Sequence, residues 1–363
     1  MSQLQYYLAL VAGGLCAAGL ALSFATPLET ALLLKAFLAL GFLSLLRFAL
    51  PLGLWADGAI AALGAVAVLA GLAAFDPAPP FFWMALIATW LFAWLFVERL
   101  AAAIRAGRAT GFGMVIPLVF GVSILLFWEV VTRGAHVPQV ILPPPSQVWT
   151  RLIASLPTLW ADFQQTFLKA VLAGYLMGCA AGFVVAILVD RSPFLKAGLL
   201  PIGNFVSALP IIGIAPIMVM WFGFDWQSKA AVVVAMTFFP MLVNTVSGLN
   251  AASSIERDLM RTYAASYWQT LVKLRLPAAA PFIFNALKIN STLALIGAIV
   301  AEFFGTPIVG MGFRISTEVG RLNIDLVWAE IAMAAVAGSA FYGVIALVER
   351  SVTFWHPSVR GRA

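Results

Sequence analysis

The stretch RTYAASYWQTLVKLRLPAAAP, residues 261–281, separates two long apolar runs at residues 230–248 and 282–304. It contains three cations and two prolines but no acid. Each flanking run is long enough to cross the roughly 30 Å of hydrocarbon in a bilayer as a helix. The stretch is therefore predicted to be a loop at the membrane surface, and the fold follows from the spans on either side of it.

The composition of the whole chain places it in the membrane class. Of 363 residues, 63% are hydrophobic and 10% are charged, and the mean hydropathy is +1.01. A soluble domain carries about 25% charged residues. The sequence contains neither a phosphate-binding loop of the form G-x-x-x-x-G-K-[ST] nor a zinc-ligand spacing. We therefore expect no catalytic residue, metal or cofactor in this chain, and an energy source outside it.

Ten apolar stretches have the length of a transmembrane helix. They occupy residues 4–24, 31–50, 59–75, 81–97, 114–131, 167–189, 199–221, 230–248, 282–304 and 328–348. The first also fits a signal peptide, but it lacks a basic start, so we interpret it as a retained span. The positive-inside rule places both termini in the cytoplasm, because the arginines and lysines after spans four, six, eight and ten then share one side.

A polar segment near residues 106–111, containing glycine and arginine, divides the chain. Residues 1–110 are predicted to form an N-terminal extension of four transmembrane helices, and residues 111–363 a core of six. The core includes the cytoplasmic loop 251–281. The predicted fold class is thus an all-α polytopic membrane protein with about ten transmembrane helices.

Local signals within loop 251–281 predict two short amphipathic helices. Ser253 precedes Glu256 by three residues, and Ser266 precedes Gln269 by three residues, which is the capping-box spacing. A bend is expected near Ala264, between the two helices. Such a pair fits an interfacial helix lying on lipid headgroups as well as a docking surface for a soluble partner.

The same loop resembles the cytoplasmic signature of ABC importer permeases. That signature reads Glu-Ala-Ala, three residues, Gly and, some ten residues later, an aliphatic residue followed by Leu-Pro. Asp258, Leu259 and Met260 stand at the Glu-Ala-Ala positions, Ala264 stands at the glycine, and the RLP of residues 275–277 closes the pattern. Further blocks between residues 138 and 355, among them ILPPPSQVW, ALPIIGIAPIMVMWFGF and LALIGAIVAEFFG, are similar to the nitrate/sulfonate/taurine branch of the family.

The resemblance implies a type I importer core in the bacterial inner membrane, working as a homodimer. Two cytoplasmic ATP-binding subunits would hold ATP and Mg and dock on the loop, and an extracytoplasmic solute-binding protein would deliver the substrate. Closure of the ATPase pair would rotate spans eight and nine and open the pathway outward. The substrate stays open between sulfonate-, taurine- or nitrate-like solutes and pyrimidine-like ones. The four leading spans lie outside the resemblance.

Two sets of site residues are predicted from the loop and from polar groups inside the spans. The residues expected to couple the chain to the ATPase are Arg257, Asp258, Arg261, Tyr263, Ala264, Tyr267, Trp268 and Pro277, the last of which is expected to stop the second helix. The residues expected to line the pathway are Asn244, Lys288, Ser291, Thr292 and Glu302.

Alternatives accompany several of these assignments. The aromatic residues also fit packing against the protein's own span ends. Lys288 also fits a cation that snorkels to the cytoplasmic boundary. The plain interpretation of Glu302 is a hydrogen bond to the VGMGF loop of residues 309–313.

An ion-coupled secondary transporter is the second hypothesis for the whole chain. Such carriers use membrane-embedded acids or broken helices, and Glu302 is interpreted as almost alone among acids in the core spans. A membrane-embedded enzyme would need clustered His, Cys or acidic ligands, which the sequence lacks.

Overall fold

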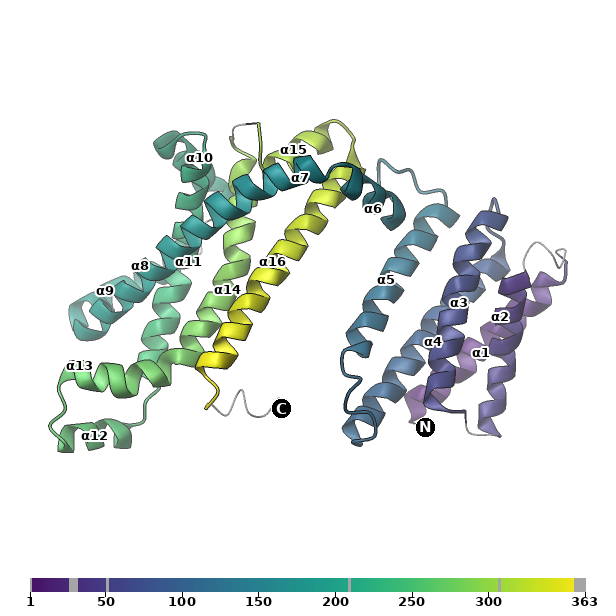
Figure 1. Ribbon diagram of the computed structural model, residues 1–363, viewed down its shortest axis with the longest axis horizontal. Coiled ribbons are helices and arrows are strands. Elements are labelled where there is room, and N and C mark those ends of the chain that lie inside the picture. Colours follow the sequence, from purple (N-terminus) through teal and green to yellow (C-terminus); the bar gives the residue numbers. More distant parts are fainter. Residues whose placement is uncertain (1, 26–31, 50–51, 208–209, 306–307, 356–363) are drawn as a thin grey trace. The chain divides into compact units, whose positions relative to one another are not determined.

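The computed structural model describes residues 2–25, 32–49, 52–207, 210–305 and 308–355. Within these ranges all regular structure is helical (Figure 1). This confirms the predicted all-α class. In the described part of the chain, eight helical runs are long and apolar enough to cross a membrane: Gln3–Ser23, Leu54–Ala74, Pro80–Arg105, Val115–Gly134, Leu156–Arg191, Trp226–Leu249, Tyr267–Glu302 and Ile324–Val352.

Two of the ten predicted spans are not among these eight, and each includes residues outside the described ranges. Within residues 31–50, α2 (Leu32–Leu43) passes into a 3-10 turn, Ser44–Phe48, where the buried Arg47 donates to the carbonyl of Ser44. In place of a span at residues 199–221, α9 (Pro193–Ser207) and α10 (Ile211–Phe222) are separate helices. Pro210, which lacks an N–H, is the N-cap of α10. In each case a polar side chain or a proline interrupts an apolar run.

The chain forms two compact units, Met1–Trp149 and Thr150–Ala363, with the boundary inside α6 (Pro145–Ala154). These units are defined by packing. The predicted functional boundary at residues 110 and 111 stays a prediction.

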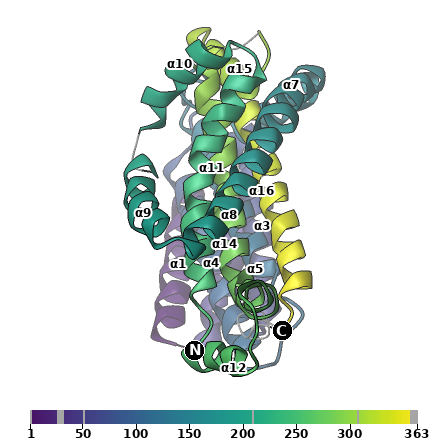
Figure 2. The same ribbon diagram turned by 90° about the vertical axis from the view of Figure 1, so that its left-hand side faces the viewer.

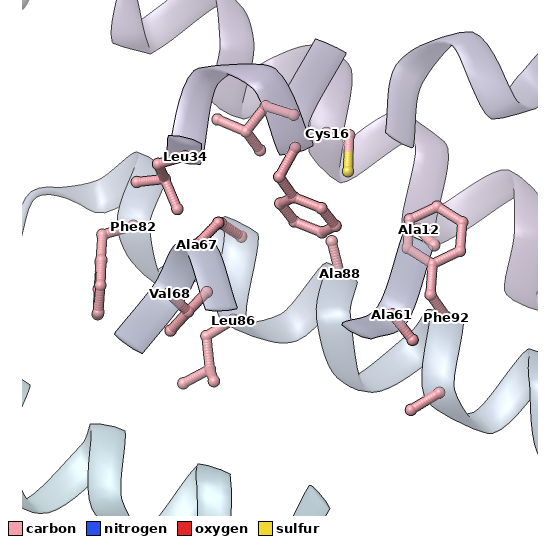
Figure 3. Close-up of a cluster of buried hydrophobic side chains, with 14 of the residues drawn as sticks. Ala12, Cys16, Leu34, Ala61, Ala67, Val68, Phe82, Leu86, Ala88 and Phe92 are labelled. Atoms are coloured by element: carbon pink, nitrogen blue, oxygen red, sulfur yellow. The ribbon is translucent and has the colours of Figure 1, made fainter. Parts of the chain in front are cut away.

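The first unit packs α1 (Gln3–Ser23), α2, α3 (Leu54–Ala74), α4 (Pro80–Arg105) and α5 (Val115–Gly134). Its core combines phenylalanines with small residues: Phe82, Phe92 and Cys16 are fully buried (Figure 3). Gly41 lies so close to Cys16 that an added Cβ would be 2.4 Å from the sulfur atom. Small residues thus allow the helices to approach closely, as is usual in membranes.

The second unit is built around α11 (Trp226–Leu249), which packs against α8 (Leu172–Arg191) and α14 (Leu276–Glu302). Gly174, Gly178 and Gly182 form the face of α8 that meets α11. A Cβ at Gly178 would lie 2.1 Å from the hydroxyl of Thr237, and one at Gly174 would lie 2.7 Å from the carbonyl oxygen of Ala230. These glycines therefore let α8 and α11 approach each other closely.

The helices of the second unit run between two ends. At one end lie α12 (Ser254–Thr262), α13 (Tyr267–Thr270) and the last turn of α16 (Ile324–Val352). At the opposite end lie α7 (Leu156–Phe163), α10 and α15 (Met311–Gly320), as Figure 2 shows. Two of the helical runs between these ends are composite: α7 joins α8 through a π-helical stretch, Gln164–Val171, and α13 joins α14 through another, Leu271–Arg275.

Candidate functional site

The elbow, which we define as α12, α13 and residues 263–266 between them, contains both predicted capping boxes. The N–H of Glu256 donates to Ser253 Oγ at 3.2 Å, and the N–H of Ser253 donates to Glu256 Oε2 at 2.8 Å. In the second box, the N–H of Gln269 donates to Ser266 Oγ at 3.3 Å, and the N–H of Ser266 donates to Gln269 Oε1 at 2.7 Å. The hydrogen bond from the Ser253 backbone lowers the pKa of Glu256. Each short helix therefore has a fixed start.

The bend of the elbow is centred on Ala264, as predicted. Its φ is +51°, in the left-handed region that L-residues other than Gly and Asn seldom adopt. The N–H of Ala264 bonds to the carbonyl of Arg261 at 2.9 Å and that of Ala265 to Met260 at 3.0 Å, which together form a Schellman motif. Glycine adopts this left-handed backbone conformation most easily, but in this chain the position is occupied by an alanine.

The apolar face of α12 is open to solvent. Ile255 is 80% exposed, Leu259 is 55% exposed and Tyr263 is 78% exposed. Arg261 forms an ion pair with Asp258 at 3.3 Å on the same short helix, and both side chains are exposed. α12 buries none of its residues against the described part of the chain. Its aromatic and aliphatic side chains are therefore available for an external contact.

A buried ion pair fixes the base of the elbow. The guanidinium of Arg275 donates to both carboxylate oxygens of Asp190 at 2.6 and 2.7 Å, and its Nε donates to the carbonyl of Leu249 at 2.9 Å. Tyr267 donates its hydroxyl proton to Asp190 at 3.0 Å. One arginine thus links the end of α8, the end of α11 and the start of the α14 run.

This arrangement separates the predicted aromatic contacts into two kinds. Tyr267 packs internally, through Asp190 and through the guanidinium of Arg191, which lies 5.5 Å from its ring centre. Trp268 is 55% exposed and Tyr263 is 78% exposed. The alternative of internal packing therefore describes Tyr267. The sequence alone did not indicate the role of Asp190, because its partner Arg275 lies 85 positions away in the chain.

Pro277 does not stop the second helix, contrary to the prediction. It stands at the start of α14, directly after the π-helical stretch Leu271–Arg275, and the helical run continues from Tyr267 to Glu302. Pro277 has no N–H to donate to the preceding turn, and the change to π-helical hydrogen bonding lies directly before it, so the run continues past the proline. At 1.5 Å per residue this run of 36 residues is about 54 Å long. The elbow is consequently one end of a long, continuous helix.

The far end of the same helix carries Glu302 inside a hydrogen-bonded cluster. Glu302 is 2% exposed; it accepts from the hydroxyl of Thr166 at 2.7 Å and from the N–H of Gly312 at 2.7 Å. The expected hydrogen bond to the VGMGF loop is therefore present. Gly312 packs so tightly that a Cβ there would lie 2.1 Å from the carbonyl oxygen of Ile299.

Two more buried acids adjoin Glu302, so the interpretation of Glu302 as almost alone is wrong. Asp162 accepts from the N–H of Gly310 at 2.6 Å and pairs with Arg314 at 2.8 Å. Glu330 is fully buried, and neither of its carboxylate oxygens has a hydrogen-bond partner among the described residues. The sequence places Asp162 just before a span and Glu330 just inside one, and the fold brings both to the end of α14.

The predicted pathway residues do not form one cluster. Lys288 pairs with Glu349 of α16 at 2.7 Å. Ser291 is buried, whereas Thr292 is exposed, and Glu302 is 14 residues, or about 21 Å along the helix, from Lys288. Asn244 is half-buried and donates to the carbonyl of Pro240 at 2.8 Å within its own helix. Of this set, Thr292 has the most open position.

Comparisons with known proteins agree with this architecture. The family described as "Binding-protein-dependent transport system inner membrane component" matches residues 174–354, which lie within the second unit. A "Probable ABC transporter permease protein" of Haemophilus influenzae is 34% identical over 215 residues, covering 59% of this chain and 87% of that protein.

Two further relatives have named solutes. The riboflavin transport system permease protein RibX of Chloroflexus aurantiacus is 30% identical over 242 residues, covering 65% of this chain and 88% of that protein. The putative aliphatic sulfonates transport permease protein SsuC of Bacillus subtilis is 28% identical over 252 residues, covering 69% of this chain and 89% of that protein. The chain belongs to the binding-protein-dependent transport system inner membrane component family, as a multi-pass permease subunit of an ABC importer in its nitrate/sulfonate/taurine branch.

Proposed function

We propose that cytoplasmic ATP-binding subunits dock on the elbow and drive import of a small solute delivered by an extracytoplasmic binding protein. The observation that carries this proposal is the open apolar face of α12, formed by Ile255, Leu259 and Tyr263 and held at a fixed angle by the bend at Ala264. Exposed aromatic residues on a rigid element are typical anchors of protein interfaces. Arg257 and Arg261 add cations that suit acidic groups on the partner. ATP and Mg belong to that partner.

The buried pair at the base of the elbow supplies a route for motion. A displacement of α13 acts at once on α8 through Asp190 and on α11 through the carbonyl of Leu249, because Arg275 binds both. It also acts on α14 directly, since the helical run is continuous to Glu302. Closure of the ATPase pair would thus rotate α11 and α14 together and switch the pathway between its two sides.

A face of α14 supports the proposals of a homodimer and of a central pathway. Phe282, Asn285, Ile289, Thr292 and Ile296 recur at helical spacing and are all exposed in the described chain. A second copy packed opposite this face would enclose Asn285 and Thr292, which offer polar contacts to a solute. Lys288, paired with Glu349, acts instead as a link between α14 and α16.

The elbow and the last turn of α16 lie at the same end of the second unit (Figure 2). We therefore propose that the end of α16 faces the cytoplasm. We propose the same for the amino terminus, because the basic residues after the predicted spans four, six and eight would then share that side. The solute is proposed to be sulfonate-, taurine- or nitrate-like, or pyrimidine-like. A thermal-shift screen of the cognate binding protein against these classes tests that choice.

The experiment that tests docking compares two matched double variants. Arg261→Glu with Tyr263→Asp reverses a charge and removes an exposed aromatic ring on the elbow. Phe194→Asp with Lys196→Glu makes the same changes on α9, where Phe194 is 85% exposed. ATP-driven uptake by proteoliposomes containing the ATPase and the binding protein should be lost in the first variant and kept in the second, with unchanged melting temperatures. Full uptake by the elbow variant would refute docking and leave α12 as a helix that lies on lipid.

A further inference from the structure

The first unit contains a cavity that the import mechanism does not use. Its volume is about 290 Å³, and it lies where the first turns of α1 and α3 meet the last turns of α4. Gln5 lines it from α1 and Leu54 from α3, while Arg99 and Arg108 line it from α4 and the residues just after it. The cavity is therefore at one end of the unit, beside the membrane surface, with two guanidinium groups in its wall.

The charge around Arg99 is unbalanced in favour of cations. The fully buried carboxylate of Asp57 pairs with Arg47 at 2.6 Å and also with Arg99, so two guanidinium groups share one acid. Arg99 donates in addition to the carbonyl of Leu52 at 2.8 Å, which fixes its side chain in the cavity wall. The Nη2 atom of Arg47 is buried and has no hydrogen-bond partner among the described residues. The group of Arg47, Asp57 and Arg99 carries a net charge of +1.

The second arginine of the cavity is free to bind a ligand. Arg108 is exposed, and the described residues offer it neither an ion pair nor a side-chain hydrogen bond. Its position is nevertheless defined, because Gly107 has a φ of +72° and the N–H of Arg108 closes the end of α4 on the carbonyl of Ala103 at 2.9 Å.

The neighbouring helix start adds to the positive potential. Gly53, the N-cap of α3, provides no side chain to cap the first N–H groups of that helix, and Leu54 beside it lines the cavity. Uncapped N–H groups at a helix start attract anions. Among the described residues at this end of the unit, the acids are Asp57 and Glu98, and the cations are Arg47, Arg99, Arg105 and Arg108.

We propose that this cavity binds a phosphate group, supplied by the headgroup of an anionic phospholipid. A guanidinium group presents paired N–H donors that match phosphate oxygens. Basic pockets between helices at the membrane surface are suited to acidic headgroups, which surround the protein at high local concentration. The shared chemistry is the phosphate anion; a soluble phosphate is the other source, and the test distinguishes the two.

The test uses the full chain and a matched pair of variants, Arg108→Gln and Arg105→Gln. Both residues are exposed arginines at the end of α4, but only Arg108 lines the cavity. Arg99 is left unchanged because it holds Asp57. Melting temperatures are measured in detergent micelles that contain phosphatidylglycerol or phosphatidylcholine at equal mole fraction, and separately with inorganic phosphate. Equal melting of both variants and the native chain in phosphatidylcholine shows that folding is intact.

We expect phosphatidylglycerol to stabilise both the native chain and Arg105→Gln. It should bind Arg108→Gln about tenfold more weakly than it binds the native chain, because that variant lacks one charged hydrogen bond. Inorganic phosphate that reproduces this pattern, with no added effect of phosphatidylglycerol, would support the phosphate site and identify a soluble source. Equal responses of Arg108→Gln and Arg105→Gln to both additions would overturn the proposal.

Discussion

Replacing Asp190 by asparagine removes the carboxylate that holds Arg275 and Tyr267 at the base of the elbow. The side chains of Arg275 and Asp190 are 12% and 5% exposed, and both guanidinium contacts are shorter than 2.8 Å. Removal of one partner from a buried ion pair costs about 3–5 kcal/mol. For a unit of this size each kcal/mol corresponds to about 2–4 °C. The melting temperature of Asp190→Asn should therefore fall by about 6–20 °C.

The assay combines thermal melting in detergent with the ratio of solute imported to ATP hydrolysed in proteoliposomes. We expect this ratio to fall in Asp190→Asn, because α13 is no longer joined to α8. Arg191→Gln is the control: Arg191 contacts the rings of Tyr267 and Trp268 at 5.5 and 5.8 Å only from the surface, and such contacts contribute about 0.5–1 kcal/mol. The double variant Asp190→Arg with Arg275→Asp should recover part of the lost melting temperature and part of the lost ratio of solute imported to ATP hydrolysed. Melting and coupling of Asp190→Asn equal to those of Arg191→Gln would refute the reasoning.

Three further predictions concern backbone shape and capping. Ala264→Gly should raise the melting temperature by about 2–4 °C, because it relieves about 1 kcal/mol of left-handed strain; a lower melting temperature would contradict this. Gly312→Ala should abolish stable folding of the loop at the end of α14, whereas Gly320→Ala, with open space around it, should fold normally in the same expression and melting tests. The pKa of Glu256 is lower in the folded protein than in the unfolded chain, where it is about 4.3, so the Glu256 carboxylate stabilises the start of α12 at pH values above about 4.3. This stabilisation is lost as the pH falls through the lower pKa of the folded state. Hydrogen-exchange protection of α12 should thus fall as the pH is lowered below about 4.3, while the box of Gln269, which cannot titrate, keeps its protection.

The sequence predicted the features that depend on neighbouring residues. Both capping boxes and the bend at Ala264 are set by spacings of three or four residues. The break at Pro210 also has a local signal, because proline lacks an N–H, but the apolar residues around it outweighed that signal.

The features that were missed depend on residues far apart in the chain. Asp190 and Arg275 are separated by 85 positions, and Thr166 and Glu302 by 136. No spacing rule joins such residues, since only the packing of α8 and α14 on α11 brings them together. Pro277 was misjudged because a π-helical stretch before it restarts the hydrogen-bond pattern, and propensity rules do not foresee that change.

The most direct test of the central claim is a photo-crosslink from the elbow to the motor subunit. The photoreactive residue p-benzoylphenylalanine is placed at Tyr263, or at Phe194 as the control, in the assembled importer. We predict that Tyr263 crosslinks to the ATP-binding subunit, with a yield that changes between the nucleotide-free and ATP-bound states, and that Phe194 does not. Crosslinks from Tyr263 to lipid alone, in both nucleotide states, would contradict the claim that the elbow is where ATP hydrolysis is coupled to import.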